Sequence, residues 1–484
     1  MSVQMTEEQQ LAVSSRGRVI VSASAGSGKT FVMIERLVAL ILGGEDVRHI
    51  LAVTFTNKAA AQMRERLRTA LLKGIAEREG TERERLKEQL AALPLAEIST
   101  IHAFCGRLVR SYFYAAGVDP AFRITGTDDA EGMELSTRAM DAAFERAYAE
   151  GGGEFSALLD VWFRRRKDAK LKGIVKELHE KMRGLADYRA KLADMGASDF
   201  FCEACETLAA DIRRRADMVC TGLSDRGYAI EALGEKFTAF ALSLEDQFTQ
   251  IAQAGGLFDM QAAAAQLPPI MHRPARRNQT EEERALIGFL AGAKDLLAGV
   301  RKDLSALAPR EEEKARCQSA AALSRALAKL VLAYDDEYAR EKADAGVLDY
   351  NDLEHCTLRL LENEQVRADL AQKYTAVFVD EYQDVNPVQE AILTRIAGDE
   401  VFLVGDAKQA IYGFRGSRSE FFEEKERFLP VSLRLSSNFR SAPAVLDAAN
   451  RVFAPLVDGY VPMQGSDRYQ EHSGEVRLYS LPKE

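Results

Sequence analysis

The chain has 484 residues, of which 74 are acidic and 64 basic, so its formal net charge is −10. One typical domain has about 100 to 200 residues, so we expect two or more cores. The acidic balance excludes a protein that coats nucleic acid by bulk charge, and nucleic-acid binding must be confined to local grooves. The sequence shows neither an apolar leader nor a membrane-spanning run, which predicts a cytoplasmic protein without membrane contact.

The first clear element is a strand, loop and helix near the amino terminus. Residues 18–22 form a short apolar run, and an amphipathic pattern begins at Phe31. A glycine-rich loop between them would turn backbone N–H groups onto phosphate at the start of the helix. In such a loop Lys29 would reach the β and γ phosphates of a nucleotide, and the Thr30 hydroxyl would ligate Mg²⁺. The residues expected to hold the nucleotide are Ala23, which stands where the usual pattern has its first glycine, Ser24, Ala25, Gly26, Ser27, Gly28, Lys29 and Thr30.

Further short β-branched runs predict strands in the outer parts of the chain, at residues 50–54, 376–380, 401–404 and 431–435. Several end in polar residues or glycine, which is typical of buried parallel strands with function at their carboxyl ends. From about residue 107 to 346 the strand pattern nearly vanishes and helical periodicity dominates, except for an expected exposed loop at 254–280. The predicted fold class is therefore α/β, a P-loop NTPase parallel sheet with a large all-α insertion domain.

A second polar segment, Asp380-Glu-Tyr-Gln-Asp384, lies at the end of the strand expected at 376–380. Asp380 would emerge at the strand end and hold Mg²⁺ through water. Glu381 is the candidate base that orients or deprotonates the attacking water. Alone, this segment fits a solvated acidic turn equally well. Together with the phosphate loop upstream, it indicates nucleoside triphosphate hydrolysis.

Seven blocks in order make the chain resemble superfamily 1 DNA helicases of the UvrD/Rep/PcrA type. They are the two segments above and residues 6–13, 54–60, 99–104, 405–416 and 438–441. The resemblance implies a RecA-like sheet and ATP as the nucleotide, with Gln9 reading adenine and Phe439 stacking on it. It also places Gln409 and Arg440 at the γ phosphate, although a surface salt bridge is the alternative for Arg440. The implied catalytic residues are Lys29, Glu381, Gln409 and Arg440.

The same resemblance implies a track for single-stranded DNA. It is formed by residues in the family's strand-contact blocks, namely Phe55, Thr56, His102, Tyr412 and Phe414. Aromatic faces stack on bases of any sequence, which is worth about 1 to 3 kcal/mol per base. Such a site needs little net positive charge, so it is compatible with an acidic chain. For Phe55 and Phe414 the alternative is a place in the core.

Within the superfamily, the chain is most similar to helicase-nuclease A subunits of the AddA type, which are RecB-like. The segments that carry this similarity are residues 22–30, 98–105, 164–171 and 348–353. The similarity implies an ATP-dependent 3′–5′ helicase and single-stranded DNA translocase acting on duplex ends with a second, AddB-like subunit, in double-strand-break repair by homologous recombination. A nucleotide-dependent DNA- or partner-binding module without processive helicase activity is the alternative.

The resemblance also predicts a division into domains. Residues 1–110 and 346–470 would form the two parts of a RecA-like motor domain 1A, and residues 111–345 a helical insertion domain 1B. Residues 471–484 would begin a second motor domain. Because no later motor motif or nuclease metal cluster follows Arg440 in this sequence, we expect a truncated chain.

Overall fold

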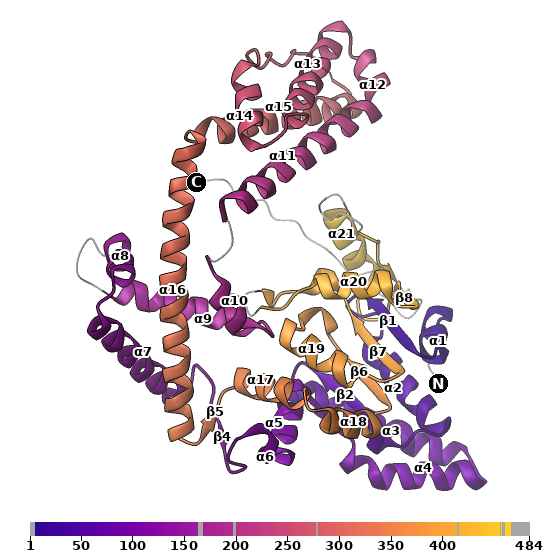
Figure 1. Ribbon diagram of the computed structural model, residues 1–484. Helices are drawn as coiled ribbons and strands as arrows, with labels where there is room; N and C mark the ends of the chain where they lie inside the picture. Colours follow the sequence, from indigo (N-terminus) through magenta and orange to yellow (C-terminus); the bar gives the residue numbers. More distant parts are fainter. Residues whose placement is uncertain are drawn as a thin grey trace, which may run out of the picture. The chain divides into compact units, whose positions relative to one another are not determined.

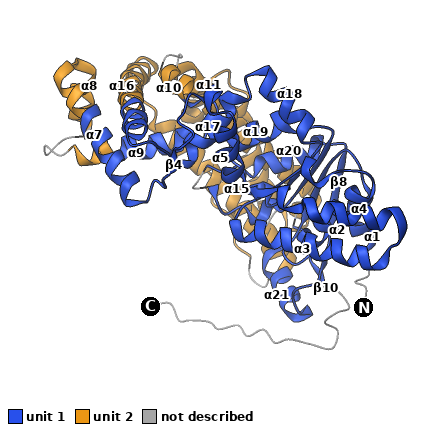
Figure 2. Ribbon diagram, turned by 90° about the horizontal axis from the view of Figure 1, so that it is seen from below, with its two compact units in different colours: residues 1–143, 173–188, 334–484 blue, residues 144–172, 189–333 orange. Residues whose placement is uncertain are grey.

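The computed structural model describes residues 5–162, 168–196, 200–276, 279–413, 416–454, 456 and 460–465. The chain divides into two compact units (Figure 2). Unit 1 comprises residues 1–143, 173–188 and 334–484, and unit 2 comprises residues 144–172 and 189–333. Phe414 and the segments 164–167 and 471–484, which carry sequence-based expectations, lie outside the described residues. The domain limits expected near residues 110, 345 and 470 stay predictions.

Unit 1 is built on a six-stranded parallel sheet with the order β3-β2-β6-β7-β1-β8 (Figure 1). The strands are β1 (Arg18–Ala23), β2 (Ile50–Thr54), β3 (Glu97–Thr100), β6 (Ala376–Val379), β7 (Glu400–Gly405) and β8 (Val431–Leu435). The predicted parallel α/β sheet is confirmed. Strand β3 was not predicted, because Ile98 is its only aliphatic residue and no periodicity can show in four residues.

Alternate residues of β1, β2, β6 and β7 enter two different cores. Val19 and Val21 pack with α2 (Lys29–Leu42) and α3 (Asn57–Glu77), whereas Ile20 packs on the other face with α5 (Ile101–Ser111) and α19 (Pro387–Ile396). Helices therefore cover both faces, as a buried parallel sheet requires. Functional side chains can emerge only at the edge where the strands end.

The remaining elements of unit 1 lie around this sheet and its loops. The helices are α1 (Glu7–Ser14), α4 (Gly80–Ala92), α6 (Phe113–Ala116), α17 (Tyr350–Leu360), α18 (Glu364–Lys373), α20 (Glu420–Phe428) and α21 (Pro443–Phe453). Short 3-10 turns are η1 (Val47–His49), η2 (Leu93–Leu95), η3 (Tyr382–Asp384) and η4 (Ala407–Gln409). Two small parallel pairs join β4 (Arg123–Ile124) with β5 (Val347–Leu348), and β9 (Ser437–Asn438) with β10 (Gln464–Gly465).

Among its described residues, unit 2 contains helices and connecting loops but no strands. It contains α8 (Gly153–Trp162), α11 (Phe200–Asp225), α12 (Gly227–Ala232), α13 (Glu235–Ala252), α14 (Leu257–Gln266), α15 (Glu281–Ala306) and most of α10 (Tyr188–Asp194). Helices α7 (Ala130–Glu150), α9 (Ala169–Arg183) and α16 (Arg310–Asp344) have residues in both units. The core of unit 2 is made by α11, α13, α14 and α15. The predicted all-α insertion is confirmed.

The expectation of one exposed loop at 254–280 was wrong in part, because α14 lies inside it. The Asp259 carboxylate accepts the Gly256 N–H at 3.0 Å and so begins the helix, and Leu257 and Met260 are buried in the core of unit 2. Glycines and prolines flank this short alanine-rich helix, and such residues are typical of a loop. In the part of the chain that the structure describes, no helix has the length and apolar character needed to span a bilayer.

Candidate nucleotide and nucleic-acid sites

The phosphate loop connects β1 to the first residue of α2, Lys29. Gly26 and Gly28 have φ values of +81° and +91°, a conformation that residues with a side chain rarely adopt. A Cβ atom at Gly26 would lie 2.6 Å from Arg440 Cβ, and one at Gly28 would lie 2.9 Å from Gln9 Nε2. Both backbone shape and crowding therefore require glycine. The loop presents its amides at a helix N-terminus, where an anion is favoured.

An ion pair joins the loop to the end of β6. Lys29 Nζ lies 2.9 Å from Glu381 Oε2, although the two residues are 352 positions apart in the chain. Among the described residues other than glycine, only Glu381 has a positive φ, of 50°. Such backbone strain is concentrated at functional positions. The structure thus brings together the two segments that the sequence singles out.

Three carboxyl groups crowd the same strand end. Burial, followed by the charge of Glu381, raises the pKa of Asp380 to about 6 and that of Asp384 to about 6. Asp384 Oδ1 is buried and has no hydrogen-bond partner. A divalent cation relieves this kind of repulsion, so the donor set fits Mg²⁺. Over the described ranges no three such side chains are arranged to hold a metal ion by themselves. Mg²⁺ commonly takes one or two protein groups, with water and phosphate oxygens as its other ligands.

Gln383 links the acidic segment to the end of β7, a role that the sequence-based prediction missed. Its buried amide donates to Glu381 Oε2 at 3.0 Å and accepts the Asp406 N–H at 3.0 Å. Gln409 Nε2 in turn donates to Asp406 Oδ2 at 2.6 Å. The candidate γ-phosphate contact Gln409 is therefore tied, through Asp406 and Gln383, to the candidate base. Gln383 stood within the acidic block, but only spatial proximity reveals its contact with Asp406.

The segment after β8 lies directly against the phosphate loop. Asn438 Nδ2 donates to the Ala25 carbonyl at 2.7 Å, and the Phe439 N–H donates to the Gly26 carbonyl at 2.8 Å. Asn438 Oδ1 also accepts the Arg440 N–H at 2.9 Å. These contacts bring Phe439 and Arg440 beside the loop. Buried Asn438 is a second residue to which the sequence assigned no role.

Gln9 is buried behind the same loop. Its amide nitrogen donates to the Ser27 carbonyl at 3.1 Å, and its amide oxygen accepts the Thr6 N–H at 3.2 Å. Both ends of the amide are thus already used within the protein. Adenine reading by Gln9 stays a prediction, and it requires these hydrogen bonds to be shared or exchanged.

The expected DNA-contact residues follow three strands of the sheet. Phe55 after β2 stacks on Tyr412 after β7, with ring centroids 4.6 Å apart and planes at 27°. Phe55 is 40% exposed, so the alternative that it is a core residue does not hold. The Thr56 hydroxyl accepts the Ala59 N–H at 3.1 Å and caps α3. His102, after β3, lies 2.9 Å from Glu354 Oε1 through Nε2, and its ring centroid is 4.9 Å from that of Tyr350.

A parallel sheet with a phosphate loop after β1 and an acidic strand end at β6 defines a P-loop nucleotide-binding protein of the α/β class. The model of the UvrD/REP helicase N-terminal domain family matches residues 5–430, and the chain belongs to this family. The expected family is thereby confirmed.

The similarity to the AddA type of helicase-nuclease subunit is also confirmed. The chain is 32% identical to the A subunit of the ATP-dependent helicase/nuclease from Alkaliphilus oremlandii, over 94% of this chain and 39% of the relative. It is 34% identical to the protein of the same name from Pelotomaculum thermopropionicum, over 94% and 39%, and to that from Bacillus licheniformis, over 98% and 41%. The chain thus spans about two fifths of the length of these relatives.

Proposed function

We propose that this chain binds ATP with Mg²⁺ and hydrolyses it at the carboxyl edge of the sheet, and that hydrolysis drives 3′–5′ movement along single-stranded DNA. The Lys29–Glu381 ion pair carries this proposal, because it joins the phosphate loop to the candidate base at 2.9 Å. Membership of a helicase family and the names of the relatives support an ATP-dependent helicase role. The wider proposal is a cytoplasmic AddAB-type motor that acts on duplex ends with an AddB-like subunit in double-strand-break repair.

Each candidate residue has a distinct part in this reaction. Lys29 neutralises phosphate charge, and Glu381 orients the attacking water and takes its proton. Thr30 and Asp380 would hold Mg²⁺, which supplies charge neutralisation at the phosphates. Gln409 and Arg440 stabilise negative charge that develops at the γ phosphate. The proposed ATP-binding residues are Gln9, Ala23, Ser24, Ala25, Gly26, Ser27, Gly28, Lys29, Thr30, Phe439 and Arg440.

The strand would cross the same edge of the sheet. Phe55 and Tyr412 offer an aromatic face, and His102 offers a second ring beside β3. Thr56 would contact the backbone, and Phe414 belongs to the same proposed set. Stacking on such faces explains how an acidic chain binds DNA without a broad basic surface.

Steady-state ATP hydrolysis by this chain with Mg²⁺, measured with and without a single-stranded oligonucleotide, tests the proposal. We expect stimulation by DNA in the native chain and a loss of about a hundredfold or more in kcat for Lys29→Ala, because transition-state charge is left uncompensated. No hydrolysis in the native chain contradicts the proposal. Hydrolysis that ignores DNA favours the alternative, a nucleotide-dependent binding module.

A further inference from the structure

Glu354 is a buried carboxylate that three side chains share. It lies on α17 and is 1% exposed. Its Oε1 accepts from His102 Nε2 at 2.9 Å and from Gln389 Nε2 at 2.6 Å, and its Oε2 accepts from Asn386 Nδ2 at 3.1 Å. Because an ionised carboxylate only accepts hydrogen bonds, the imidazole must carry its proton on Nε2.

The donors come from two functional regions of unit 1. His102 belongs to the proposed DNA track after β3. Asn386 caps the first turn of α19, and Gln389 lies in that turn. This helix follows the acidic strand end of β6 after only the short turn η3. One carboxylate therefore contacts a residue of the proposed DNA track and two residues at the start of the helix that follows the acidic strand end.

Packing alone does not account for a charge at this position. Burial raises the pKa of Glu354, but the hydrogen bonds from His102, Gln389 and Asn386 outweigh it, and the net pKa lies below the ordinary value. An apolar side chain of similar size commonly stabilises a core as well as a buried ionic group does. We therefore attribute the presence of a carboxylate at this position to its contacts with His102 on one side and with Asn386 and Gln389 on the other.

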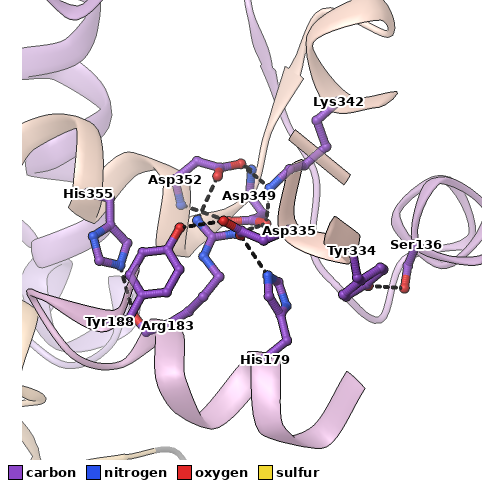
Figure 3. Close-up of polar contacts among 10 residues, drawn as sticks. All are labelled: Ser136, His179, Arg183, Tyr188, Tyr334, Asp335, Lys342, Asp349, Asp352 and His355. Atoms are coloured by element: carbon purple, nitrogen blue, oxygen red, sulfur yellow. Dashed lines mark hydrogen bonds and ion pairs between the residues drawn. The ribbon is translucent and has the colours of Figure 1, made fainter. Parts of the chain in front are cut away.

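Helix α17 is well placed to transmit such a contact. Tyr350 in its first turn is 49% exposed and lies against the His102 ring, one helical turn from Glu354. The same end of the helix is anchored by Asp349 and Asp352, which pair with Arg183 at 3.1 and 2.7 Å and with Lys342 at 2.6 Å each (Figure 3). Through Glu354, His102 is thus linked both to α17 and to the start of α19.

We propose that Glu354 is a positioning residue that couples strand binding at His102 to nucleotide binding at the end of β6. This inference rests on the proposed function, since it assigns how the two proposed sites communicate. Glu354 touches neither ligand. It acts because a change in either donor region alters the hydrogen bonds available to the other.

Coupling is measured on the 484-residue chain as the ratio of two dissociation constants. One is for a fluorescent oligothymidylate alone, and the other for the same oligonucleotide with Mg²⁺ and a saturating non-hydrolysable ATP analogue. Typical coupling between sites is about 5- to 150-fold. We expect Glu354→Gln, which keeps the volume but not the charge, to bring the ratio to within twofold of one. Its affinity for the nucleotide analogue alone should stay within twofold of the native value.

Two further variants separate coupling from general damage. Gln389→Met removes the shorter of the two hydrogen bonds from α19 to Glu354 without touching His102. It should bring the ratio toward one, with no additional loss of coupling in the double variant. Asp335→Asn is the matched control. It removes the charge from another buried carboxylate of unit 1, which lies 2.8 Å from His179 and accepts the Tyr188 hydroxyl at 2.9 Å (Figure 3). Neither partner is a residue of the two proposed sites. The coupling ratio of this variant should remain native.

The outcomes distinguish the two proposals. A native chain that binds neither the analogue nor the oligonucleotide refutes the proposed function, and the inference with it. A native chain that binds both with a ratio of one overturns the inference alone. Native coupling in Glu354→Gln, or an equal loss in Asp335→Asn, likewise overturns it.

Discussion

At the scale of single residues, the phosphate loop is shaped by side chains that lie far from it in the sequence. Gln9 donates to the Ser27 carbonyl, and Asn438, in the segment after β8, donates to the Ala25 carbonyl. Each contact uses a backbone acceptor, so the loop can keep its amides for phosphate. The proposed ATP site is therefore built by three regions of the chain.

Gly26 should be intolerant of any side chain. In Gly26→Ala the new methyl group would meet Arg440 Cβ at 2.6 Å in addition to the strain of a φ of +81°. Gly17→Ala is the control, because Gly17 has a φ of +79° with no atom within 4 Å of the added Cβ. We expect Gly17→Ala to cost about 1 to 2 kcal/mol of unfolding free energy from strain alone. Gly26→Ala should cost more and weaken analogue binding at least tenfold, as denaturant titration and fluorescence titration will show. Equal effects of the two changes on stability and binding would rule out the crowding argument.

Asp380 gives the site a pH dependence of defined sign. Its pKa is raised from 3.8 to about 6, chiefly by burial, so the folded chain binds this proton more tightly than the unfolded chain. The contribution of protonated Asp380 to the unfolding free energy is fully present below pH 4 and is lost as the pH rises through 6. Asp380→Asn should therefore raise the unfolding free energy at pH 8, by at most about 3 kcal/mol at 1.4 kcal/mol per pKa unit, and change it little at pH 4.

The same carboxyl links Mg²⁺ binding to pH. Since Mg²⁺ requires the ionised form, Mg²⁺-dependent hydrolysis by the native chain should fall as the pH drops below 6, and Asp380→Asn should abolish it. Thermal melts and ATPase assays across pH 4 to 8 check both effects. A destabilised Asp380→Asn chain at pH 8 contradicts the assignment of the raised pKa.

At the scale of elements, α17 connects regions that the sequence separates. Its first residues are anchored to α9 and α16 by the buried group Arg183, Lys342, Asp349 and Asp352 (Figure 3). The charges of Arg183 and Lys342 hold the pKa of Asp352 well below its usual value, against the effect of burial. Removing one member of such a group leaves the others uncompensated in a dry environment.

Arg183→Met should accordingly destabilise unit 1 by about 3 to 5 kcal/mol, because two buried carboxylates lose a partner. Lys181→Met on the same helix α9 is the control. Its exposed pair with Glu177 should contribute nothing measurable. Denaturant unfolding of both variants at pH 7 is the measurement. If Arg183→Met is as stable as Lys181→Met, the buried group does not anchor α17.

At the scale of the whole molecule, the two units have separate cores. The apolar clusters of unit 1 line the two faces of the sheet, and that of unit 2 is formed between helices α11 to α15. A chain with separate cores need not unfold in one step. The proposed nucleotide-binding residues all belong to unit 1.

Core substitutions in the two units should therefore act on different unfolding transitions. Leu290→Ala in unit 2 and Leu51→Ala in unit 1 each truncate a fully buried leucine and should cost about 2 to 5 kcal/mol in their own unit. An ATP analogue with Mg²⁺ should stabilise only unit 1, which is the unit that Leu51→Ala destabilises. Hydrogen exchange read by mass spectrometry follows both units at once. Leu290→Ala with native protection in unit 2 would falsify the assignment of its core.

Local sequence patterns were sufficient to predict most of the sheet and the chemistry that its loops carry. Short apolar runs identify five of the six sheet strands, and the glycine-rich loop with Lys29 identifies the nucleotide chemistry, because both signals lie within a few neighbouring residues. Strand β3 was missed because its pattern is too short. Helix α14 was missed because the loop-like residues on both sides of it mask its pattern.

Which side chains meet is a property of the tertiary packing. The strand order places β1 between β7 and β8, so residues from both ends of the chain converge on one loop. The contacts of Lys29 with Glu381 and of Glu354 with His102 depend on this order and on the packing of helices against each face. Those contacts arise between residues hundreds of positions apart, where no local periodicity records them.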